Sequence, residues 1–387
     1  MRRPRVAHVA TIDLTVRALL LPQLVGLRES GYDVAAISSP GPFVPEVEEA
    51  GIRHIPWRNA TRAWDPGADA RAFAELVGIL RSERFDVVHT HNAKPGVMGR
   101  IGARLAGTRA VVNTVHGFDA TPEDPLPRRA MFMGAEWVAA RFSHVELYQG
   151  AEDLERARRL RMVGARKGVF LGNGIDLERF DPCRVPAERV AVLRSELGVG
   201  SEELLVGTVG RLVGEKGYRE LFRAARVVRA RHPHVRFLAV GDPDPAKDDA
   251  ITQRELDAAA DDVVVTGWRK DVPELLAAMD VFVLATWREG VPRSAIEAAA
   301  MGKPLVLTDI PGCRQVARDG IEAVHVPVRA PDRLAAAIQR LVEDEPLRTR
   351  MGAAARERAL RDFDERAIVG TILHEYGKLL RNKGFDR

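Results

Sequence analysis

Short runs of β-branched and other apolar residues alternate along the chain with longer segments in which apolar residues recur every three or four positions. The short runs predict buried parallel strands, and the three-four spacing predicts helices that cover a sheet. In the first half, strands are expected at residues 6–10, 34–37, 87–89, 111–115 and 144–147. In the second half, they are expected at residues 204–209, 235–240, 263–266, 281–284 and 304–308. The alternation predicts an α/β protein with two doubly wound parallel sheets.

A break between the two patterns falls at residues 172–176, where two glycines and an asparagine interrupt the periodicity as a hinge would. The chain ends in helical patterns at residues 332–343 and about 365–381, with Pro346 between them. A length of 387 residues exceeds the roughly 100 to 200 residues of one ordinary domain. Length and pattern together predict two domains of similar architecture.

Composition narrows the class of protein. The chain is 46% hydrophobic and 29% charged, as globular proteins are, and its net charge of +4 is not gathered into a basic stripe with aromatic residues, so nucleic acid is not an expected partner. The two cysteines, Cys183 and Cys313, have no C-x-x-C spacing, which favours a reducing cytoplasm over a disulfide framework or a zinc site. His8 and Asp13 interrupt the first apolar run, so it predicts a strand, not a signal peptide. No apolar stretch approaches the roughly 18 to 20 residues of a membrane helix.

The segment 286–297 directly follows a predicted strand, which is where open parallel sheets bind ligands. Gly290 allows backbone amides to approach a ligand, and a helix beginning near Ser294 directs its positive end to the same place. Glu289 and Glu297 are suited to accept hydrogen bonds from sugar and ribose hydroxyls. The alternative is that Ser294 and Glu297 only form a capping box, which leaves Glu289 and Gly290 unexplained.

The segment 209–217 also follows a predicted strand and contains three glycines, at positions 210, 214 and 217. Arg211 and Lys216 supply two cations at the mouth of this glycine-rich turn. Two fixed cations stabilise a diphosphate leaving group without a metal, Arg through paired hydrogen bonds and Lys as a point charge. The alternative is a solvated turn with surface cations. The Walker pattern is absent.

His116, at the end of a predicted strand in the first half, is a candidate to face a transferred sugar, although a lone histidine is often structural. His89 and His91 suggest a metal pair, but we expect alternating strand positions to place them on opposite faces. Asp242 and Asp244 imitate the Asp-x-Asp metal motif but are expected to form a plain loop. No metal site is therefore predicted.

These segments resemble glycosyltransferase family 4, the retaining class with the two-domain GT-B fold, and the resemblance runs nearly end to end. Residues 288–304 resemble the family's E-x7-E element, residues 308–320 resemble the segment that follows it, and residues 266–272 resemble its base-binding loop. Residues 86–100 and 114–118 resemble a bacterial subgroup that builds capsular, exopolysaccharide and lipid-linked glycans.

The resemblance assigns roles to residues. It implies that Arg211 and Lys216 bind the diphosphate, that Glu289 and His116 contact the donor sugar, and that these four are the catalytic residues. Glu297 would hold the ribose, and the backbone of residues 267–269 would meet the base. The substrate-binding residues expected in this way are Gly210, Gly267, Trp268, Arg269, Gly290, Val291, Pro292, Glu297 and Thr15. Thr15 belongs to a first loop, 11–16, that lacks the paired glycines of many relatives.

The resemblance also implies a domain plan in which the last helix crosses back to the first domain. An N-terminal, acceptor-side domain would comprise residues 1–174 with about 363–387, and a C-terminal, nucleotide-sugar-binding domain residues 175–362, with the two facing a central cleft. The expected co-substrate is a nucleotide-diphosphate sugar, favouring uridine diphosphate, with neither a cofactor nor a metal. The expected acceptor is a glycan or an undecaprenyl-diphosphate-linked glycan, as in cell-surface polysaccharide synthesis.

The expected mechanism is front-face transfer with retention of the anomeric configuration, in which a phosphate oxygen helps remove the acceptor's proton. Closure about residues 172–176 would exclude water. We expect the protein in the cytoplasm. Segment 126–142 mixes Arg128, Arg129 and Arg141 with aromatic residues, so peripheral contact at the inner face of the membrane is a further hypothesis. The alternative is a helix packed on its own sheet with arginines outside.

Other functions are compatible with parts of the pattern. A nucleotide-sugar epimerase of the same architecture would need no acceptor, and a glycosyltransferase acting on a small-molecule acceptor would share the donor motifs. A dinucleotide-dependent oxidoreductase is disfavoured because no G-x-G-x-x-G follows the first strand. A non-catalytic nucleotide-sugar binder is disfavoured by the intact Arg211, Lys216, Glu289 and Glu297.

Overall fold

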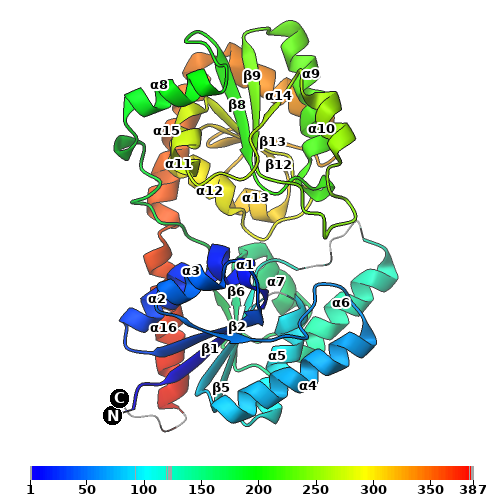
Figure 1. Cartoon of the computed structure of the whole chain (residues 1–387), viewed down its shortest axis with the longest axis vertical. Coiled ribbons are helices and arrows are strands. Elements are labelled where there is room, and N and C mark those ends of the chain that lie inside the picture. Colours follow the sequence, from blue (N-terminus) through cyan, green and yellow to red (C-terminus); the bar gives the residue numbers. More distant parts are fainter. Residues whose placement is uncertain (1, 92, 119, 121–123, 383, 385–387) are drawn as a thin grey trace. The chain divides into compact units, whose positions relative to one another are not determined.

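A computed structural model describes residues 2–91, 93–118, 120, 124–382 and 384 (Figure 1). The chain divides into two compact units, Met1–Gly172 with Glu365–Arg387, and Asn173–Asp364. The predicted domain ranges include residues 1, 92, 119, 121–123, 383 and 385–387, which lie outside the described residues. Each unit is an α/β domain with its own sheet and its own core.

The first unit is built on a seven-stranded sheet with the order β3-β2-β1-β4-β5-β6-β7, in which every pairing is parallel. This is a doubly wound order that reverses direction between β1 and β4. The strands are β1 (Arg5–Ile12), β2 (Asp33–Ser39), β3 (Arg53–Pro56), β4 (Val87–His91), β5 (Ala110–Val115), β6 (Val145–Tyr148) and β7 (Gly168–Phe170).

Helices cover both faces of this sheet, as buried apolar strands on both faces require. They are α1 (Asp13–Thr15), the π-helical turn η1 (Val16–Leu20), α2 (Leu21–Glu29), α3 (Val44–Glu49), α4 (Pro66–Glu83), α5 (Ala93–Leu105), α6 (Leu126–Ala139), α7 (Ala151–Arg159) and α16 (Glu365–Arg381). One face packs against α4 and α5, and the other packs against α2 and α16.

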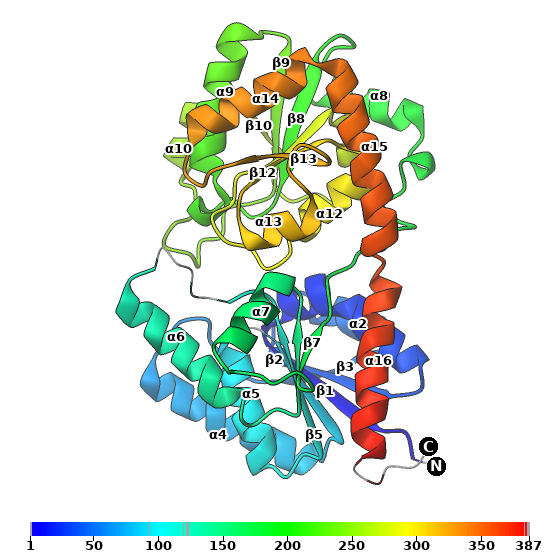
Figure 2. The same ribbon diagram turned by 180° about the vertical axis from the view of Figure 1, so that it is seen from behind.

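The last helix, α16, therefore belongs to the first unit, as predicted (Figure 2). Its Ile368, Ile372, Tyr376 and Leu380 recur at four-residue spacing and are buried in the same cluster as residues of β1 and β4. Val369 of the same helix contacts Gly26 of α2. This helix thus covers one face of the first sheet, although about 200 residues separate it in the sequence from the rest of the first unit.

The second unit has a six-stranded sheet with the order β10-β9-β8-β11-β12-β13, again with parallel pairings throughout. Its direction of winding reverses between β8 and β11. The strands are β8 (Leu204–Val209), β9 (Val235–Val240), β10 (Val264–Val265), β11 (Val281–Leu284), β12 (Leu305–Thr308) and β13 (Ala323–Val326).

Helices also cover both faces of the second sheet, which has one apolar cluster on each side. The helices are α8 (Ala187–Glu196), α9 (Tyr218–Arg231), α10 (Gln253–Ala259), α11 (Val272–Ala278), α12 (Arg293–Ala300), α13 (Pro311–Val316), α14 (Pro331–Glu343) and α15 (Glu345–Asp362), with two short 3-10 turns, η2 (Pro182–Arg184) and η3 (Gly214–Lys216).

The predicted strands are present, and three further strands were missed: β3, β7 and β13. β3 and β7 lie at the two edges of the first sheet and β13 lies at an edge of the second. All three are short and only partly buried, so they lack the continuous apolar run of a central strand. The sequence analysis also missed α15: Pro346, expected to lie between two helices, is in the first turn of this further helix, where proline is tolerated. Among the described helices, none has both the length and the apolar character that crossing a membrane requires.

One buried ion network joins α5 and α6 to β5 and β6. Arg100 of α5 is completely buried and donates to Glu146 of β6 at 2.8 Å and to Glu136 of α6 at 2.6 Å. Glu146 also accepts hydrogen bonds from Asn113 and Ser143, so its carboxylate is fully engaged. The two carboxylates raise the pKa of Arg100 even though burial acts in the opposite direction. This network fixes α5 and α6 to the sheet.

Replacing one member of this network should destabilise the first unit strongly. Glu146→Ala removes one of the two carboxylate partners of the Arg100 guanidinium, which stays buried. The loss should lower the free energy of unfolding by about 3–5 kcal/mol. Urea unfolding of the full chain would measure the loss. As a control, Arg53→Ala removes an ion pair whose arginine is 47% exposed, and it should change stability by less than about 1 kcal/mol. Equal effects of the two substitutions would contradict this account of the network.

Candidate donor-binding site

Two loops of the second unit follow β8 and β11, which are neighbours in the sheet. The order of the strands reverses between them, and a doubly wound sheet leaves a crevice at the carboxyl ends of such strands. The loop after β8 carries Arg211 and Lys216, and the loop after β11 carries Glu289. The sequence placed these residues in separate motifs, and the topology brings the motifs to one edge of one sheet.

The two loops are joined by backbone contacts. Trp287 donates its backbone N–H to the carbonyl of Glu215 at 2.8 Å, and the Thr286 hydroxyl donates to the same carbonyl at 3.0 Å. Gly217 has a φ of +76° and lies against the backbone of Ala285, where an added Cβ would collide with the Ala285 carbonyl. Only glycine satisfies both conditions. The turn therefore holds Lys216 directly beside the loop after β11.

Lys216 and Glu289 form an ion pair across these loops. Each side chain is 18% exposed, so the pair is accessible from solvent but largely surrounded by protein. A partly buried ammonium beside a carboxylate can exchange one anionic partner for another, such as a phosphate oxygen, while the carboxylate becomes an acceptor for hydroxyl groups. The pair is thus arranged for a ligand that carries both phosphate and hydroxyl groups.

Arg211 lies on the outer side of the same turn. Its side chain is 40% exposed and is paired with Asp244, and Glu215 is 4.0 Å away. Asp244 is therefore the ion-pair partner of Arg211, and Asp242 lies against Gly267, with a carboxylate oxygen 3.0 Å from the position that a Cβ would take. Among the described residues, the group with metal-site spacing is His8, His89 and His91, and neither aspartate belongs to it.

Glu215 is a carboxylate that the sequence analysis did not select. It contacts Arg288 at 3.2 Å and Lys247 at 3.4 Å, in addition to Arg211. Although burial acts to raise the pKa of Glu215, Lys247, Arg288 and Lys216 together hold that pKa below its usual value. Glu215 therefore stays ionised near neutral pH and balances the cations gathered at this edge.

Glu297 belongs to α12, which begins at Arg293, so Glu297 lies in the second turn of that helix. The residue before the helix is Pro292, and no side chain caps the helix start, so the capping box expected as the alternative is not formed. Burial raises the pKa of Glu297, and Arg293 and Arg179 oppose this effect. Glu297 is not engaged by its own helix terminus, and the uncapped amides at the start of α12 are available to an anion.

The predicted base-binding loop follows β10. Gly267 accepts a hydrogen bond from the backbone N–H of Gly241 at 2.9 Å, and Gly241, with a φ of +143°, lies so close to Gly210 that a Cβ would collide with the Gly210 carbonyl. Trp268 is 50% exposed, and Arg269 forms an ion pair with Asp271. The loops that contain Gly210 and Gly267 are thus linked through Gly241.

Asn173 is a residue whose contribution the sequence did not reveal. Its side-chain amide donates to the carbonyl of Val291 at 2.8 Å, and its own oxygen accepts from the N–H of Gly174. Asn173 is buried, so this bond supports the segment Gly290–Pro292 from behind. The sequence indicated only that residues 172–176 interrupt the periodicity, because the partner lies 118 positions away.

In the first unit, the predicted loop 11–16 was wrong: β1 continues to Ile12 and α1 begins directly at Asp13, so Thr15 lies in a helical turn. The Asp13 carboxylate accepts from the backbone N–H of Leu14 at 2.9 Å and of Phe43 at 2.7 Å. These two bonds close the connection without the paired glycines that a loop would use.

His116 follows β5 and is partly exposed, and its Nε2 lies 3.0 Å from Nδ1 of His91. Burial lowers the pKa of His116 to about 4, and a side-chain hydrogen bond with Gln149 opposes this effect. His116 is therefore neutral near pH 7. It is suited to hydrogen-bond a sugar, and less suited to donate a full proton.

The prediction that His89 and His91 point to opposite faces was wrong. Residues two positions apart on a strand share a face, and the two rings stack with centroids 4.3 Å apart. With His8 of β1 they form a buried group whose ligand-capable atoms lie within 4.8 Å of one another. This is the cluster among the described residues that approaches metal-site spacing, although its ring nitrogens are already occupied by hydrogen bonds.

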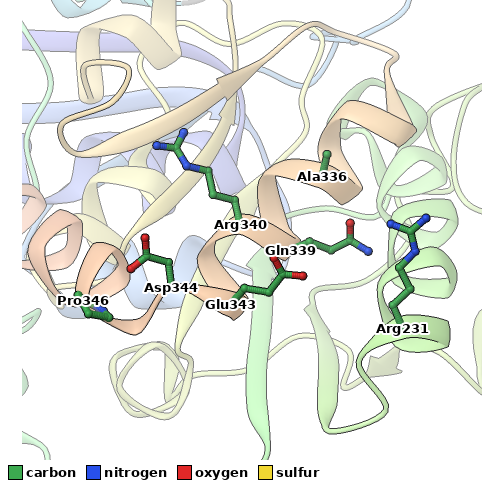
Figure 3. A pocket seen from close by; sticks show the side chains of 7 residues that line it. All are labelled: Arg231, Ala336, Gln339, Arg340, Glu343, Asp344 and Pro346. Carbon is green, nitrogen blue, oxygen red and sulfur yellow. The ribbon is translucent and has the colours of Figure 1, made fainter.

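Two hollows lie on the surface of the second unit. The larger, about 630 Å³, lies between α9 and the end of α14 (Figure 3) and is lined by Arg231, Ala336, Gln339, Arg340, Glu343, Asp344 and Pro346. The other, about 490 Å³, is lined by residues that follow β12 and precede or end β13, among them Asp309, Arg314 and His325. Neither is lined by a predicted site residue.

Family comparisons agree with this geometry. Residues 16–174 match the family model described as "Glycosyl transferase 4-like domain", and residues 203–344 match the one described as "Glycosyl transferases group 1". The first match lies in the first unit apart from its last two residues, and the second lies within the second unit.

Characterised relatives align over nearly the whole chain. One is the UDP-Gal:alpha-D-GlcNAc-diphosphoundecaprenol alpha-1,3-galactosyltransferase of Escherichia coli, 27% identical over 98% of both chains. Another is the N,N'-diacetylbacillosaminyl-diphospho-undecaprenol alpha-1,3-N-acetylgalactosaminyltransferase of Campylobacter jejuni, 23% identical over 98% of this chain and 100% of that one. These relatives are transferases, which supports the predicted transferase over the epimerase.

Solved structures share the fold. HepE of Anabaena in complex with UDP-glucose superposes with a TM-score of 0.81 at 20% identity, covering 97% of this chain and 99% of that one. WaaG, a glycosyltransferase involved in lipopolysaccharide biosynthesis, superposes with a TM-score of 0.71 at 16% identity, covering 92% and 95%. The two α/β units, the motifs at the edge of the second sheet and the matches to both halves agree, and the chain belongs to glycosyltransferase family 4, with the GT-B fold.

Proposed function

We propose that this glycosyltransferase transfers a sugar, with retention of configuration, from a uridine-diphosphate sugar to a lipid-linked glycan acceptor used for cell-surface polysaccharide. The proposal for the donor rests on the ion pair between Lys216 and Glu289 at the edge of the second sheet, beside Arg211 and the start of α12. The proposal for the acceptor is supported by the relatives whose names give undecaprenyl-diphosphate-linked substrates.

In this proposal the donor replaces the resting ion pair. The diphosphate takes Lys216 and Arg211 as partners and lies toward the uncapped amides of α12, while Glu289 accepts hydrogen bonds from the sugar. Glu297 accepts from the ribose, and the backbone of Gly267–Arg269 meets the base. The cations stabilise the negative charge that develops as the glycosidic bond breaks, so no metal and no side-chain nucleophile is assigned to the step.

The first unit contributes the acceptor side in this proposal, with His116 as a neutral hydrogen-bonding partner of the donor sugar. A phosphate oxygen of the donor assists removal of the acceptor's proton, because His116 is not assigned as a base. Exclusion of water from the reaction would limit hydrolysis of the donor.

We also propose that α6 contacts the inner face of the membrane, where a lipid-linked acceptor would be found. Ala139 is the one residue of α6 that is fully buried, while Leu126, Met131, Trp137 and Val138 are 74, 60, 44 and 49% exposed. Arg128 and Arg129 share this helix, and Arg141 lies over Trp137 at 3.7 Å. Exposed apolar residues with arginines are the combination that an anionic bilayer binds.

Substitution of Lys216 tests the leaving-group role. Lys216→Met should lower kcat about 100-fold, because a cation that stabilises developing charge is lost. Steady-state release of UDP in the presence of acceptor would measure it. Arg226→Met, which removes an exposed cation of α9 paired with Asp262, should leave kcat within about two-fold. A Lys216→Met enzyme with normal kcat would refute the assignment.

Substitutions of Glu297 and Glu289 should distinguish recognition of the nucleotide from recognition of the sugar. Glu297→Gln should weaken UDP about ten-fold or more, because charge-assisted bonds to ribose hydroxyls are lost. Glu289→Gln should leave UDP affinity nearly unchanged but remove most of the preference for the UDP-sugar over UDP. Isothermal titration with both ligands gives the four affinities.

Glu343→Gln, on the exposed end of α14, serves as the control and should change none of these affinities. If both glutamate variants weakened UDP equally, the division of roles would be wrong. If any of these variants bound guanosine diphosphate more tightly than UDP, the assignment of uracil as the base of the donor would be wrong.

Membrane contact is tested by vesicle sedimentation. The wild type should bind vesicles containing anionic lipid, and reversing Arg128 and Arg129 to glutamate should lower the partition coefficient by roughly thirty-fold or more, since each arginine contributes about 1 kcal/mol. The matched control reverses Arg333 and Arg340, which are exposed on α14. Absence of binding by the wild type, or an equal loss in the control, would reject the α6 surface.

A further inference from the structure

A continuous chain of hydrogen bonds crosses the interior of the first unit. The Tyr376 hydroxyl of α16 lies 3.2 Å from Nε2 of His8, and Nδ1 of His8 lies 2.9 Å from Nε2 of His91. Nδ1 of His91 then lies 3.0 Å from Nε2 of His116. The chain thus runs from the last helix, through β1 and β4, to the residue at the end of β5.

A branch completes the set of partners. Nδ1 of His89 lies 2.6 Å from the Tyr376 hydroxyl, and Nε2 of His89 lies 2.7 Å from the hydroxyl of Thr114. His8, His89, His91 and Tyr376 are completely buried, whereas His116 is partly exposed. Both nitrogens of each buried ring therefore have a partner, and the chain reaches solvent through His116.

The roles of donor and acceptor in this chain are coupled. A neutral imidazole carries one N–H and one lone pair, so each ring must donate on one side and accept on the other. Burial lowers the pKa of His8 to about 3 and holds the pKa values of His89 and His91 well below the usual range, so these rings are neutral. The direction in which Tyr376 donates its single proton therefore sets the tautomer of every ring down to His116.

We propose that His91, His8 and Tyr376 are positioning residues for His116: their hydrogen-bond chain fixes the orientation of the His116 ring and selects the tautomer that it presents to the donor sugar. The contact between His116 and the sugar rests on the proposed function, whereas the selection of the tautomer does not. Gln149, the other side-chain partner of His116, lies at the end of the chain where a sugar hydroxyl would join or replace it.

A metal ion held by His8, His89 and His91 is the competing explanation for the cluster. Metal binding would break the His8–His91 hydrogen bond, and no carboxylate is among the groups that these three rings contact in the described part of the chain. A divalent charge without a neutralising partner is costly in such a buried place. The observed hydrogen bonds between the rings therefore favour a hydrogen-bond network over a metal site.

The direct test is nitrogen-15 NMR of the histidine rings in the full-length protein labelled at histidine. The wild type should show one tautomer of His116 at neutral pH, with both ring nitrogens at the shifts of a neutral ring. Tyr376→Phe keeps the packing of the ring but removes the hydroxyl at the end of the chain, so His116 should become a mixture of tautomers. Tyr32→Phe, a buried tyrosine in edge contact with Tyr376, is the control and should leave the His116 signals unchanged.

Two substitutions of His91 keep the test decisive if Tyr376→Phe does not fold. The amide of His91→Asn occupies the place of Nδ1 and can still bond His116, whereas the shorter side chain does not reach His8. His91→Leu loses both bonds. The kcat for sugar transfer should fall about ten-fold in Tyr376→Phe and further in His91→Leu, with partial recovery in His91→Asn and unchanged affinity for UDP alone.

Three results would overturn the proposal: an unchanged single tautomer of His116 in Tyr376→Phe and in both His91 variants, normal kcat in all of them, or stoichiometric zinc in the purified wild type by elemental analysis. If the wild type lacked transferase activity, the proposed function would fail, but the NMR signals would still decide whether the chain selects the tautomer.

Discussion

Close backbone contact between the loops at the carboxyl edge of the second sheet is the constraint on which the candidate donor site depends. Gly217 lies against the carbonyl of Ala285, and Gly241 lies against that of Gly210. A side chain at either position would separate the loops, and both glycines also have positive φ angles. These contacts place the Lys216 ammonium beside the Glu289 carboxylate although the two residues lie 73 positions apart.

The electrostatics of this edge follow from that contact. Arg211, Lys216, Lys247 and Arg288 form ion pairs with Asp244, Glu289 and Glu215, and Glu215 pairs with several of them at once. In the absence of ligand each cation has a protein partner, so the loops are stable before the donor arrives. A diphosphate would offer these cations more negative charge than a single carboxylate does, which gives the donor its advantage over the resting ion pairs.

The sequence was informative where one property dominates a segment. Central strands such as β8 and β11 consist mainly of buried apolar residues, so their positions along the chain and the loops after them could be predicted. Edge strands such as β13 are short and only partly buried, and they could not be distinguished from loops.

Contacts between distant segments were beyond the sequence pattern. The hydrogen bond from Asn173 to Val291 and the position of Tyr376 against His8 depend on tertiary packing. No local spacing of residues predicts these contacts. The error over His89 and His91 was of another kind, because the two-residue period of a strand already places them on one face. Recognition of that period would have indicated the buried histidine group before the structure did.

The central claim is that a nucleotide diphosphate binds where the loops after β8 and β11 meet. A crystal structure of the protein with bound UDP tests it most directly. The account predicts the diphosphate within hydrogen-bond distance of Arg211 and Lys216, and a ribose hydroxyl within hydrogen-bond distance of the Glu297 carboxylate. A well-ordered UDP bound elsewhere, with Lys216 still paired to Glu289, would contradict it.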